Sequence, residues 1–320
     1  MGSLLSDDSF GWGEGMSLVM QYFIDLKALL RQGNPYLFYV YHFFVLKNLL
    51  CTKIFSIKTG RERFYGFTVY HNNFNSFFAV FTEIFVHQIY KSPPMIAPTI
   101  VDCGANIGLA TLYYKMVFPD CKVFAFEPDH ENFLLLRLNV QGNGLRDVWL
   151  FEQGVGDKFE RKSLFSPKEF QGSVGSTTNK ECNFHECYSE CEVQIVPVSR
   201  LKESHNVSKI DVLKIDIEGD ESLVFKDLFE AGMLSSVGVV ALEYHFVYGI
   251  KSNKLSTILD CVERAGLQCY ISHDDLIGEW VTWDTFKKYH RYILIIKCYN
   301  NKVLCVEGEN SDVSDRRKEK

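Results

Sequence analysis

The sequence predicts an α/β protein built on a doubly wound, mostly parallel sheet. Two stretches carry this prediction. From Pro98 to Pro128, an apolar run, a glycine-punctuated turn, a helical pattern and a second apolar run follow one another, which is the order of a βαβ unit. From Ile210 to Ile215 the chain is almost continuously apolar, as expected of a parallel strand that is buried on both faces.

The turn of the first unit carries the groups of a nucleoside site. Its strand ends on Asp102, Gly104 and Gly108 punctuate the loop, and a helix is expected over 109–117. The next strand ends on Glu127, about 20 residues after the last glycine, where an acid accepts hydrogen bonds from a ribose diol. Glycine also lets backbone N–H groups face a ligand without a Cβ in the way.

Asp102 separates this turn from a dinucleotide site. A carboxylate at the mouth of the loop would repel a pyrophosphate, but it suits a ligand with an ammonium group. S-adenosylmethionine has a ribose and an α-amino acid and no phosphate, so we expect it as the ligand. An NAD-dependent oxidoreductase and a catalytically silent nucleotide-binding module are the alternatives.

Composition restricts the partners. The 320 residues are 47% hydrophobic and 23% charged, with a formal net charge of −6, which argues against nucleic acid as the main partner. Residues 1–15 are polar and glycine-rich instead of resembling a secretory signal, and most of the ten cysteines lie in apolar runs. We therefore expect a reducing, cytoplasmic location. The start of the chain fits the myristoylation pattern at Gly2 only weakly.

Three regions are expected along the chain: an N-terminal helical extension over 1–63, the catalytic domain over 64–305 and a disordered tail over 306–320. The extension holds helical patterns over 17–30 and 36–50, and the second is shorter than the about 20 apolar residues that span a bilayer. We expect these helices to cover the sheet or to form a homodimer surface, in preference to membrane contact.

The remaining elements follow from hydrophobic spacing and from turn residues. They are two short strands around Gly60 within 54–70, helices over 74–90, 131–140 and 255–265, and strands over 123–126, 148–151, 237–242, 269–272 and 292–298. We expect the last two strands to pair antiparallel and to close the sheet.

Two segments are less regular. The loop from Gln153 to Asp157 follows the third strand and is a candidate edge for the adenine, on topology alone. Four candidate zinc ligands lie close together, namely Cys182, His185, Cys187 and Cys191. Their spacing matches no paired C-x-x-C knuckle, and an exposed insertion is the preferred interpretation.

The candidate catalytic residues follow two neighbouring strands. Asp216 and Glu218 come directly after the strand over 210–215, and Glu243 and His245 follow the next strand. Ligands bind at the carboxyl ends of the strands in an open α/β sheet, so we expect these side chains in one crevice. We assign Asp216 and His245 to proton removal and Glu218 to acceptor positioning. A divalent cation held by the carboxylates is the alternative.

The chain resembles the FkbM-type S-adenosylmethionine-dependent methyltransferases. The resemblance rests on segments between about residues 64 and 298, which are Glu83–Tyr90, Val101–Gly108, Phe124–Asp129, Glu131–Leu136, Asp211–Gly219 and Leu242–His245. It implies a class I methyltransferase fold and methyl transfer to a hydroxyl oxygen of a small molecule, sugar or lipid. By this resemblance the cofactor contacts are Asp102, Gly104, Asn106, Gly108 and Glu127.

Overall fold

The computed structural model describes residues 12–50, 59–167, 175–180, 188–247, 252–273 and 291–304. Gly2, the tail over 306–320 and three of the four candidate zinc ligands (Cys182, His185 and Cys187) lie outside these residues. Cys191 is described and is exposed. Among the described helices, none combines the length and the apolar character that a bilayer crossing requires.

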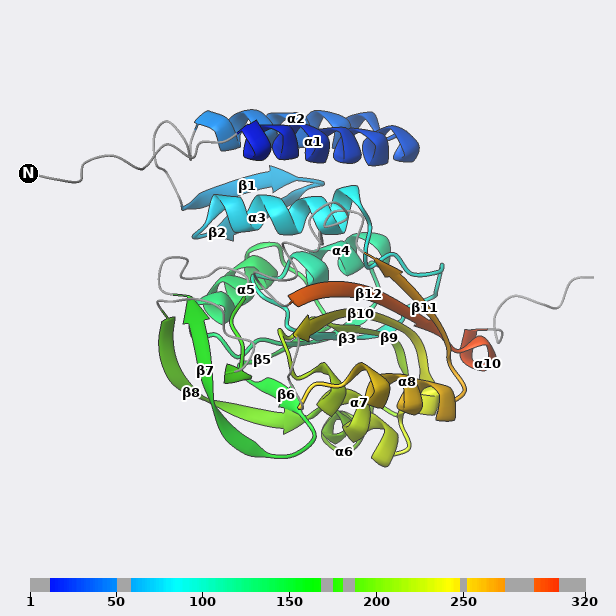
Figure 1. Cartoon of the computed structure of the whole chain (residues 1–320). Helices are drawn as coiled ribbons and strands as arrows, with labels where there is room; N and C mark the ends of the chain where they lie inside the picture. Colours follow the sequence, from blue (N-terminus) through cyan, green and yellow to red (C-terminus); the bar gives the residue numbers. More distant parts are fainter. Residues whose placement is uncertain are drawn as a thin grey trace, which may run out of the picture.

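A seven-stranded sheet forms the centre of the molecule, in the order β11-β12-β10-β9-β3-β4-β5 (Figure 1). Its strands are β3 (Thr99–Cys103), β4 (Lys122–Phe126), β5 (Val148–Phe151), β9 (Ile210–Ile215), β10 (Val237–Val247), β11 (Gln268–His273) and β12 (Arg291–Tyr299). The neighbouring strands from β10 to β5 pair in parallel, and β12 pairs antiparallel with both β10 and β11. The predicted doubly wound sheet with an antiparallel closing strand is confirmed.

Helices cover both faces of this sheet. α4 (Leu109–Val117) and α5 (His130–Gly142) lie on one face, and α7 (Glu221–Glu230) and α8 (Leu255–Arg264) lie on the other, as Figure 1 shows. The two faces contribute to two separate clusters of buried apolar side chains. Short turns of helix occur at η5 (Val198–Arg200), α6 (Leu201–Ser204), η6 (Leu234–Ser236) and α10 (Asn301–Leu304).

The N-terminal region adds two further layers above α4 and α5. α1 (Trp12–Gln32) and α2 (Pro35–Lys47) form the outermost layer, and Asn34 caps α2 by accepting a hydrogen bond from the backbone N–H of Leu37 at 3.1 Å. Beneath them lie β1 (Gly60–Phe64), β2 (Phe67–His71), α3 (Phe74–Phe81) and the π-helical turn η2 (Thr82–Val86) (Figure 1).

Two expectations for this region were wrong. The helices α1 and α2 do not cover the central sheet, because β1, β2 and α3 lie between them and the rest of the molecule (Figure 1). The second expectation placed the turn between the two short strands at Gly60. The turn of the hairpin is instead formed by Tyr65 and Gly66, which have φ values of 49° and 82°, and Gly60 is the first residue of β1. The expected boundary at residue 63 therefore falls inside a strand.

An aromatic core joins the N-terminal layers to the catalytic region. The ring of Phe44 in α2 packs edge-on against Phe64 and Phe81, and Phe85 packs in the same way against Tyr113 of α4 at 5.6 Å between centroids. Such aromatic pairs add stabilisation beyond the apolar area that they bury. The extension is therefore packed as part of one continuous core.

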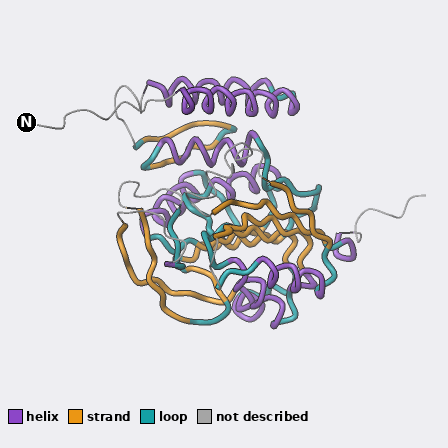
Figure 2. The backbone as a smooth tube through the Cα atoms, viewed as in Figure 1, coloured by secondary structure: helices purple, strands orange, loops and turns teal. Residues whose placement is uncertain are grey.

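A second sheet lies beside the β5 edge of the central one. It has the order β6-β8-β7, from β6 (Gly154–Gly156), β7 (Glu160–Pro167) and β8 (Tyr188–Pro197). Figure 2 shows its strands curving away from the main sheet. Ser166 and Ser176 donate hydrogen bonds to Asp129 at 2.7 and 3.3 Å, so this sheet is anchored at the start of α5.

Candidate functional site

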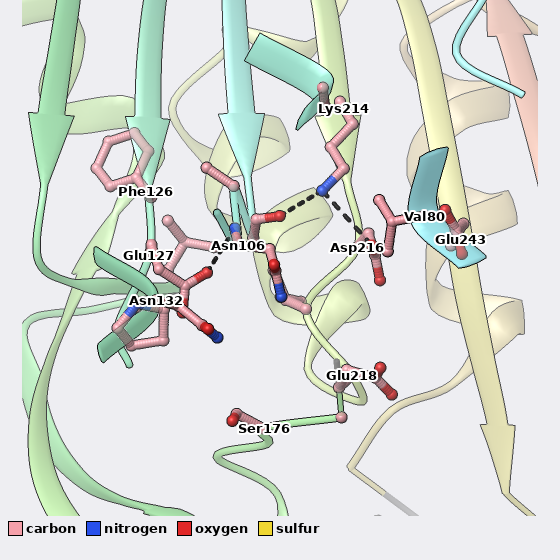
Figure 3. Close-up of a pocket in the computed structure, with 18 of the residues that line it drawn as sticks. Val80, Asn106, Phe126, Glu127, Asn132, Ser176, Lys214, Asp216, Glu218 and Glu243 are labelled. Atoms are coloured by element: carbon pink, nitrogen blue, oxygen red, sulfur yellow. Dashed lines mark hydrogen bonds and ion pairs between the residues drawn. The ribbon is translucent and has the colours of Figure 1, made fainter. Parts of the chain in front are cut away.

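A pocket opens at the carboxyl ends of β3, β4, β9 and β10, where Figure 3 looks into it. The hollow measures about 1190 Å³ including its open mouth. Glu127 and Asn132 lie on one side of the pocket in Figure 3, and Asp216 and Glu218 lie on the other.

At Gly104 the backbone of the glycine turn itself forms part of the pocket wall, because this residue has no side chain. Gly104 has a φ of +79°, and a Cβ there would lie 1.8 Å from the carbonyl oxygen of Asp216. Its N–H and that of Ala105 donate to the carbonyl of Phe126 at 3.0 and 2.9 Å. Gly104 and Asn106 both line the pocket, as expected. Only glycine fits at residue 104, because any side chain would separate β3 from β9.

Glu127 lies at the end of β4 and lines the pocket. Its two carboxyl oxygens accept backbone N–H groups of Asn106 at 2.8 Å and Asp129 at 2.9 Å. Burial raises the pKa of Glu127 to about 8, although these two donors lower it. Each oxygen keeps a second lone pair for a ligand. The structure thus brings Glu127 and the glycine turn together, as the sequence predicted.

Asp102 and Gly108 do not reach the pocket surface. The Asp102 side chain is fully buried, accepts a hydrogen bond from Thr111 of α4 at 2.8 Å and lies 3.4 Å from the ammonium of Lys214. Because the Asp102 side chain is buried beneath the pocket wall, it does not face a ligand directly, contrary to the prediction. Gly108 begins α4 with a φ of +95°, and a Cβ there would lie 2.8 Å from Leu136. Both residues support the turn from beneath.

Of the two residues predicted for the adenine edge, only one lines the pocket. Gln153 lines the pocket, and its buried Oε1 accepts no hydrogen bond from any described residue, while its Nε2 donates to Gln194 at 2.6 Å. Asp157 instead lies outside the pocket and accepts a hydrogen bond from Lys226 of α7 at 2.7 Å. The adenine-edge prediction for Asp157 is not supported, because its carboxylate is engaged in this ion pair.

The three predicted catalytic residues converge. His245 Nε2 lies 3.3 Å from Glu218 Oε2 and 3.9 Å from Asp216 Oδ1. The expected strand boundary was wrong here, because β10 continues through Glu243 and His245 to Val247, paired along this stretch with β12. Residues two apart on a strand face the same side, so Glu243 and His245 both line the pocket.

Three carboxylates surround His245. Burial lowers the pKa of His245, but Glu218, Glu221 and Asp216 raise it by more, so that it lies well above its usual value of 6.5. The part of His245 in proton removal stays a prediction.

Sequence reasoning missed Lys214. Its ammonium is buried beneath the glycine turn, donates to the carbonyl of Gly104 at 2.5 Å and lies 3.4 Å from Asp102 and 3.5 Å from Asp216 (Figure 3). Burial lowers the pKa of Lys214, and Asp216, Asp102 and Glu243 raise it above its usual value. A lysine inside an otherwise apolar strand is the signal that could have identified this residue.

Tyr90 and Glu243 form a second buried link. The Tyr90 hydroxyl donates to Glu243 Oε1 and lies 3.4 Å from Asp216 Oδ2. Burial and the charges of Glu243 and Asp216 hold the pKa of Tyr90 well above 10, and burial and Asp216 raise that of Glu243 to about 8. The helix expected over 74–90 ends at Val86, and Tyr90 lies in the turn that follows. Nothing in its local sequence shows that it reaches the pocket.

Comparison with known proteins identifies the family. A family model described as "Methyltransferase FkbM domain" matches residues 102–269, just over half of the chain and all of the elements that line the pocket from β3 to β10. The chain belongs to the FkbM methyltransferase family. The resemblance found in the sequence is confirmed, and the cofactor is S-adenosylmethionine.

Individual relatives are distant. Methyltransferase 1 of Beauveria bassiana (strain ARSEF 2860) is 28% identical over 162 residues, which cover 46% of this chain and 65% of that protein. The 31-O-demethyl-FK506 methyltransferase FkbM of Streptomyces tacrolimicus is 28% identical over 210 residues, which cover 58% of this chain and 80% of that protein. A crystal structure of methyltransferase FkbM from Methylobacillus flagellatus KT aligns with a TM-score of 0.40 and 18% identity, over 63% of this chain and 44% of that one.

The residues of the pocket fit this cofactor. A ribose needs an acceptor for two hydroxyl groups, and Glu127 offers a carboxyl group at the pocket wall. An adenine amino group needs an acceptor, and Gln153 Oε1 is a buried acceptor that no described residue satisfies. The backbone of Gly104 leaves room where any side chain would not fit. The FkbM chain therefore has the polar groups that the adenosine half requires.

Proposed function

We propose that this FkbM methyltransferase transfers the methyl group to a hydroxyl oxygen of a small molecule, sugar or lipid. The observation that carries the proposal is the convergence of Asp216, Glu218 and His245 at the side of the pocket opposite Glu127. A neutral hydroxyl is a poor nucleophile, and a carboxylate at this place can accept its proton as the bond to carbon forms.

The cofactor side of the pocket is assigned from the polar groups on its wall. We assign Glu127 to the ribose hydroxyls, Gln153 to the adenine edge and the backbone of Gly104 and Asn106 to the amino acid half. When bound, S-adenosylmethionine supplies an electrophilic methyl group on a sulfonium sulfur. Lys214 holds the carbonyl of Gly104 and so fixes the turn on which the cofactor would lie.

The acceptor side is assigned to four residues with different tasks. Asp216 accepts the hydroxyl proton while the oxygen–carbon bond forms and the carbon–sulfur bond breaks. Tyr90 lies 3.4 Å from the same carboxylate and donates to Glu243, which links Asp216 to a second carboxyl group. Glu218 and His245 position the acceptor.

Identification of the methylated atom tests the proposal. The purified chain is incubated with methyl-labelled S-adenosylmethionine and a panel of alcohols, sugars, amines and activated carbon acids, and products are assigned by carbon NMR and mass spectrometry. We expect the label in an O-methyl ether. Label found only on nitrogen or carbon would overturn the proposed acceptor atom and leave the family assignment intact.

Variants of the acceptor side test the roles of its residues. Asp216→Asn should lower kcat by about 10²-fold or more, the usual contribution of a general base, and keep the affinity for S-adenosylmethionine within a factor of a few. Calorimetric titration of the cofactor and initial rates with the identified acceptor give the two quantities. His245→Ala should lower kcat as well, through loss of acceptor positioning. Unchanged kcat in both variants would refute this assignment.

A further inference from the structure

We propose that Asp216, Glu218 and His245 bind a divalent metal cation at the acceptor side of the pocket. The inference deepens the proposed hydroxyl methylation, because the cation would take an oxygen of the acceptor as a further ligand. The binding of the metal can nevertheless be measured without any acceptor. The carboxylates and the imidazole offer one ligand atom each.

The spacing of the three groups suits a single cation. Their candidate ligand atoms all lie within 4.8 Å of one another. Ligands about 2.1 Å from an octahedral cation lie about 3 Å apart when adjacent and about 4.2 Å apart when opposite. His245 Nε2 lies 3.3 Å from Glu218 Oε2 and 3.9 Å from Asp216 Oδ1, so small side-chain rotations place all three around one ion.

The orientation of His245 is an independent observation. Its Nδ1 lies 2.8 Å from Oε1 of Glu221, which is fully buried and is itself held by the backbone N–H of Gly219 at 2.9 Å and by the side-chain amide of Asn253. Metal-ligating histidines usually donate their second ring N–H to a carboxylate in this way. Because Nδ1 is occupied by Glu221, Nε2 is the nitrogen that faces the two pocket carboxylates.

The backbone at Glu218 is held in an uncommon conformation. Glu218 has a φ of +59°, a left-handed value that non-glycine residues adopt mainly where the surroundings enforce it. Thr177 donates to the Glu218 carbonyl at 2.6 Å, and Asn179 donates to the Gly219 carbonyl at 3.0 Å. Residues of the insertion between β7 and β8 therefore fix the turn that presents Glu218 to His245.

The local charge favours a cation. Asp216, Glu218 and Glu221 supply three carboxyl groups around His245. The ammonium of Lys214 approaches Oδ2 of Asp216, not the Oδ1 that faces His245, and it is shared with Asp102. Two carboxylates and one imidazole without a thiolate suit Mn²⁺ better than the softer thiophilic ions. The open side of the site faces the pocket, where water or an acceptor oxygen would complete the coordination.

Titration with Mn²⁺ alone tests the site. The full chain is stripped with EDTA, and binding is followed by calorimetry and by the loss of the free Mn²⁺ signal in electron paramagnetic resonance. We expect one Mn²⁺ per chain, with at least 10-fold weaker binding in Glu218→Gln and in Asp216→Asn. Glu221→Gln should weaken binding by about 10-fold to 100-fold, as expected for an outer partner of a ligating histidine.

A matched control separates a specific site from general charge. Glu152→Gln removes an exposed carboxylate that lies 2.6 Å from His130, and it should leave Mn²⁺ binding unchanged. Circular dichroism melting confirms that each variant is folded. The absence of stoichiometric binding to the wild-type chain would overturn the metal site, and so would wild-type affinity for Mn²⁺ in both Glu218→Gln and Asp216→Asn.

Activity distinguishes the two proposals from each other. Full O-methylation by the EDTA-stripped chain in the absence of Mn²⁺ binding would overturn the metal site and support the proposed function. Stoichiometric Mn²⁺ binding that depends on Glu218 and Asp216, together with a methylated nitrogen or carbon product, would support the metal site and overturn the proposed acceptor atom.

Discussion

Two buried carboxyl groups, those of Glu127 and Glu243, lie in the wall of the pocket. Glu127 and Glu243 lie on opposite sides of it, and burial raises the pKa of each to about 8. Glu127 is held by two backbone donors, and Glu243 by the hydroxyl of Tyr90. Each group therefore has a fixed direction before any ligand arrives.

The affinity for the cofactor depends on Glu127. Glu127→Ala should weaken binding of S-adenosylmethionine by roughly 2–3 kcal/mol, because the ribose loses hydrogen bonds to a carboxyl group. Calorimetric titration measures the change, and Glu152→Ala is the control because that exposed carboxylate lies outside the pocket lining. Equal affinities of the wild-type chain and Glu127→Ala would contradict the ribose assignment.

The raised pKa of Glu127 also predicts how stability depends on pH. The usual value is 4.5 and the folded value is about 8, so between these values the folded chain binds more protons than the unfolded chain. The contribution of Glu127 to the free energy of unfolding is therefore fully present below about pH 4.5 and is lost as the pH rises to about 8. The loss amounts to at most roughly 1.4 kcal/mol per pH unit. Glu127→Gln cannot titrate, so its free energy of unfolding should fall less over pH 5–8.

Urea denaturation at several pH values measures this difference. The free energies of unfolding of the wild-type chain and Glu127→Gln should diverge steadily with rising pH, in favour of the variant. A difference that stays constant from pH 5 to pH 8 would show that Glu127 is already ionised throughout this range.

At the scale of elements, the helix α2 has apolar residues on all of its faces, but only one face is packed against the rest of the molecule. Leu37, Val40 and Phe44 are buried, whereas Tyr39 and Phe43 are exposed. The buried face packs on the aromatic side chains of β1 and α3. The stability that the helix contributes should therefore come from that face alone.

A pair of neighbouring substitutions tests this asymmetry. Phe44 is 1% exposed and Phe43 is 49% exposed. Phe44→Ala should lower the free energy of unfolding by about 3–5 kcal/mol, because it leaves a cavity in the aromatic core. At a protein concentration at which the chain is monomeric, Phe43→Ala should change the free energy of unfolding by less than about 0.5 kcal/mol. Chemical denaturation followed by circular dichroism measures both. Similar losses in the two variants would mean that the outer face is also packed.

At the scale of the whole molecule, the two helices of the outermost layer expose several large apolar side chains. Among them are Met20, Phe23, Leu30, Tyr39, Phe43 and Leu46. Exposed apolar side chains mark a site of interaction where they form one patch. The homodimer expected from the sequence therefore stays a prediction, and α1 and α2 are the elements on which it depends.

Light scattering after size exclusion tests the dimer. We expect a mass of about twice 36.9 kDa for the wild-type chain without detergent and a monomer for the double variant Tyr39→Glu and Phe43→Glu, because the carboxylates would be buried without partners. A monomeric wild-type chain would contradict the prediction. Quantitative flotation with liposomes would assign the same surface to a membrane instead.

Local patterns in the sequence determined the strand–turn–helix–strand unit around Gly104 and Gly108. The helix over 109–117 was predicted with its observed bounds, and the carboxyl groups of Glu127, Asp216 and Glu218 were placed at the correct edge of the sheet. These features depend on hydrophobic period, on glycine and on the rule that parallel strands end at one edge. The first two are properties of neighbouring residues, and the third is a general rule of parallel sheets.

Only the tertiary structure decided which groups meet. Tyr90 contacts Glu243 across 153 positions of the chain, and Lys214 contacts the carbonyl of Gly104 across 110. Asp102 faces α4 because alternate residues of a strand face opposite sides, and the sequence does not say which side holds the ligand. The charge of His245 likewise depends on carboxylates from another strand end and helix. Burial and long-range contacts set these properties, so no local pattern could reveal them.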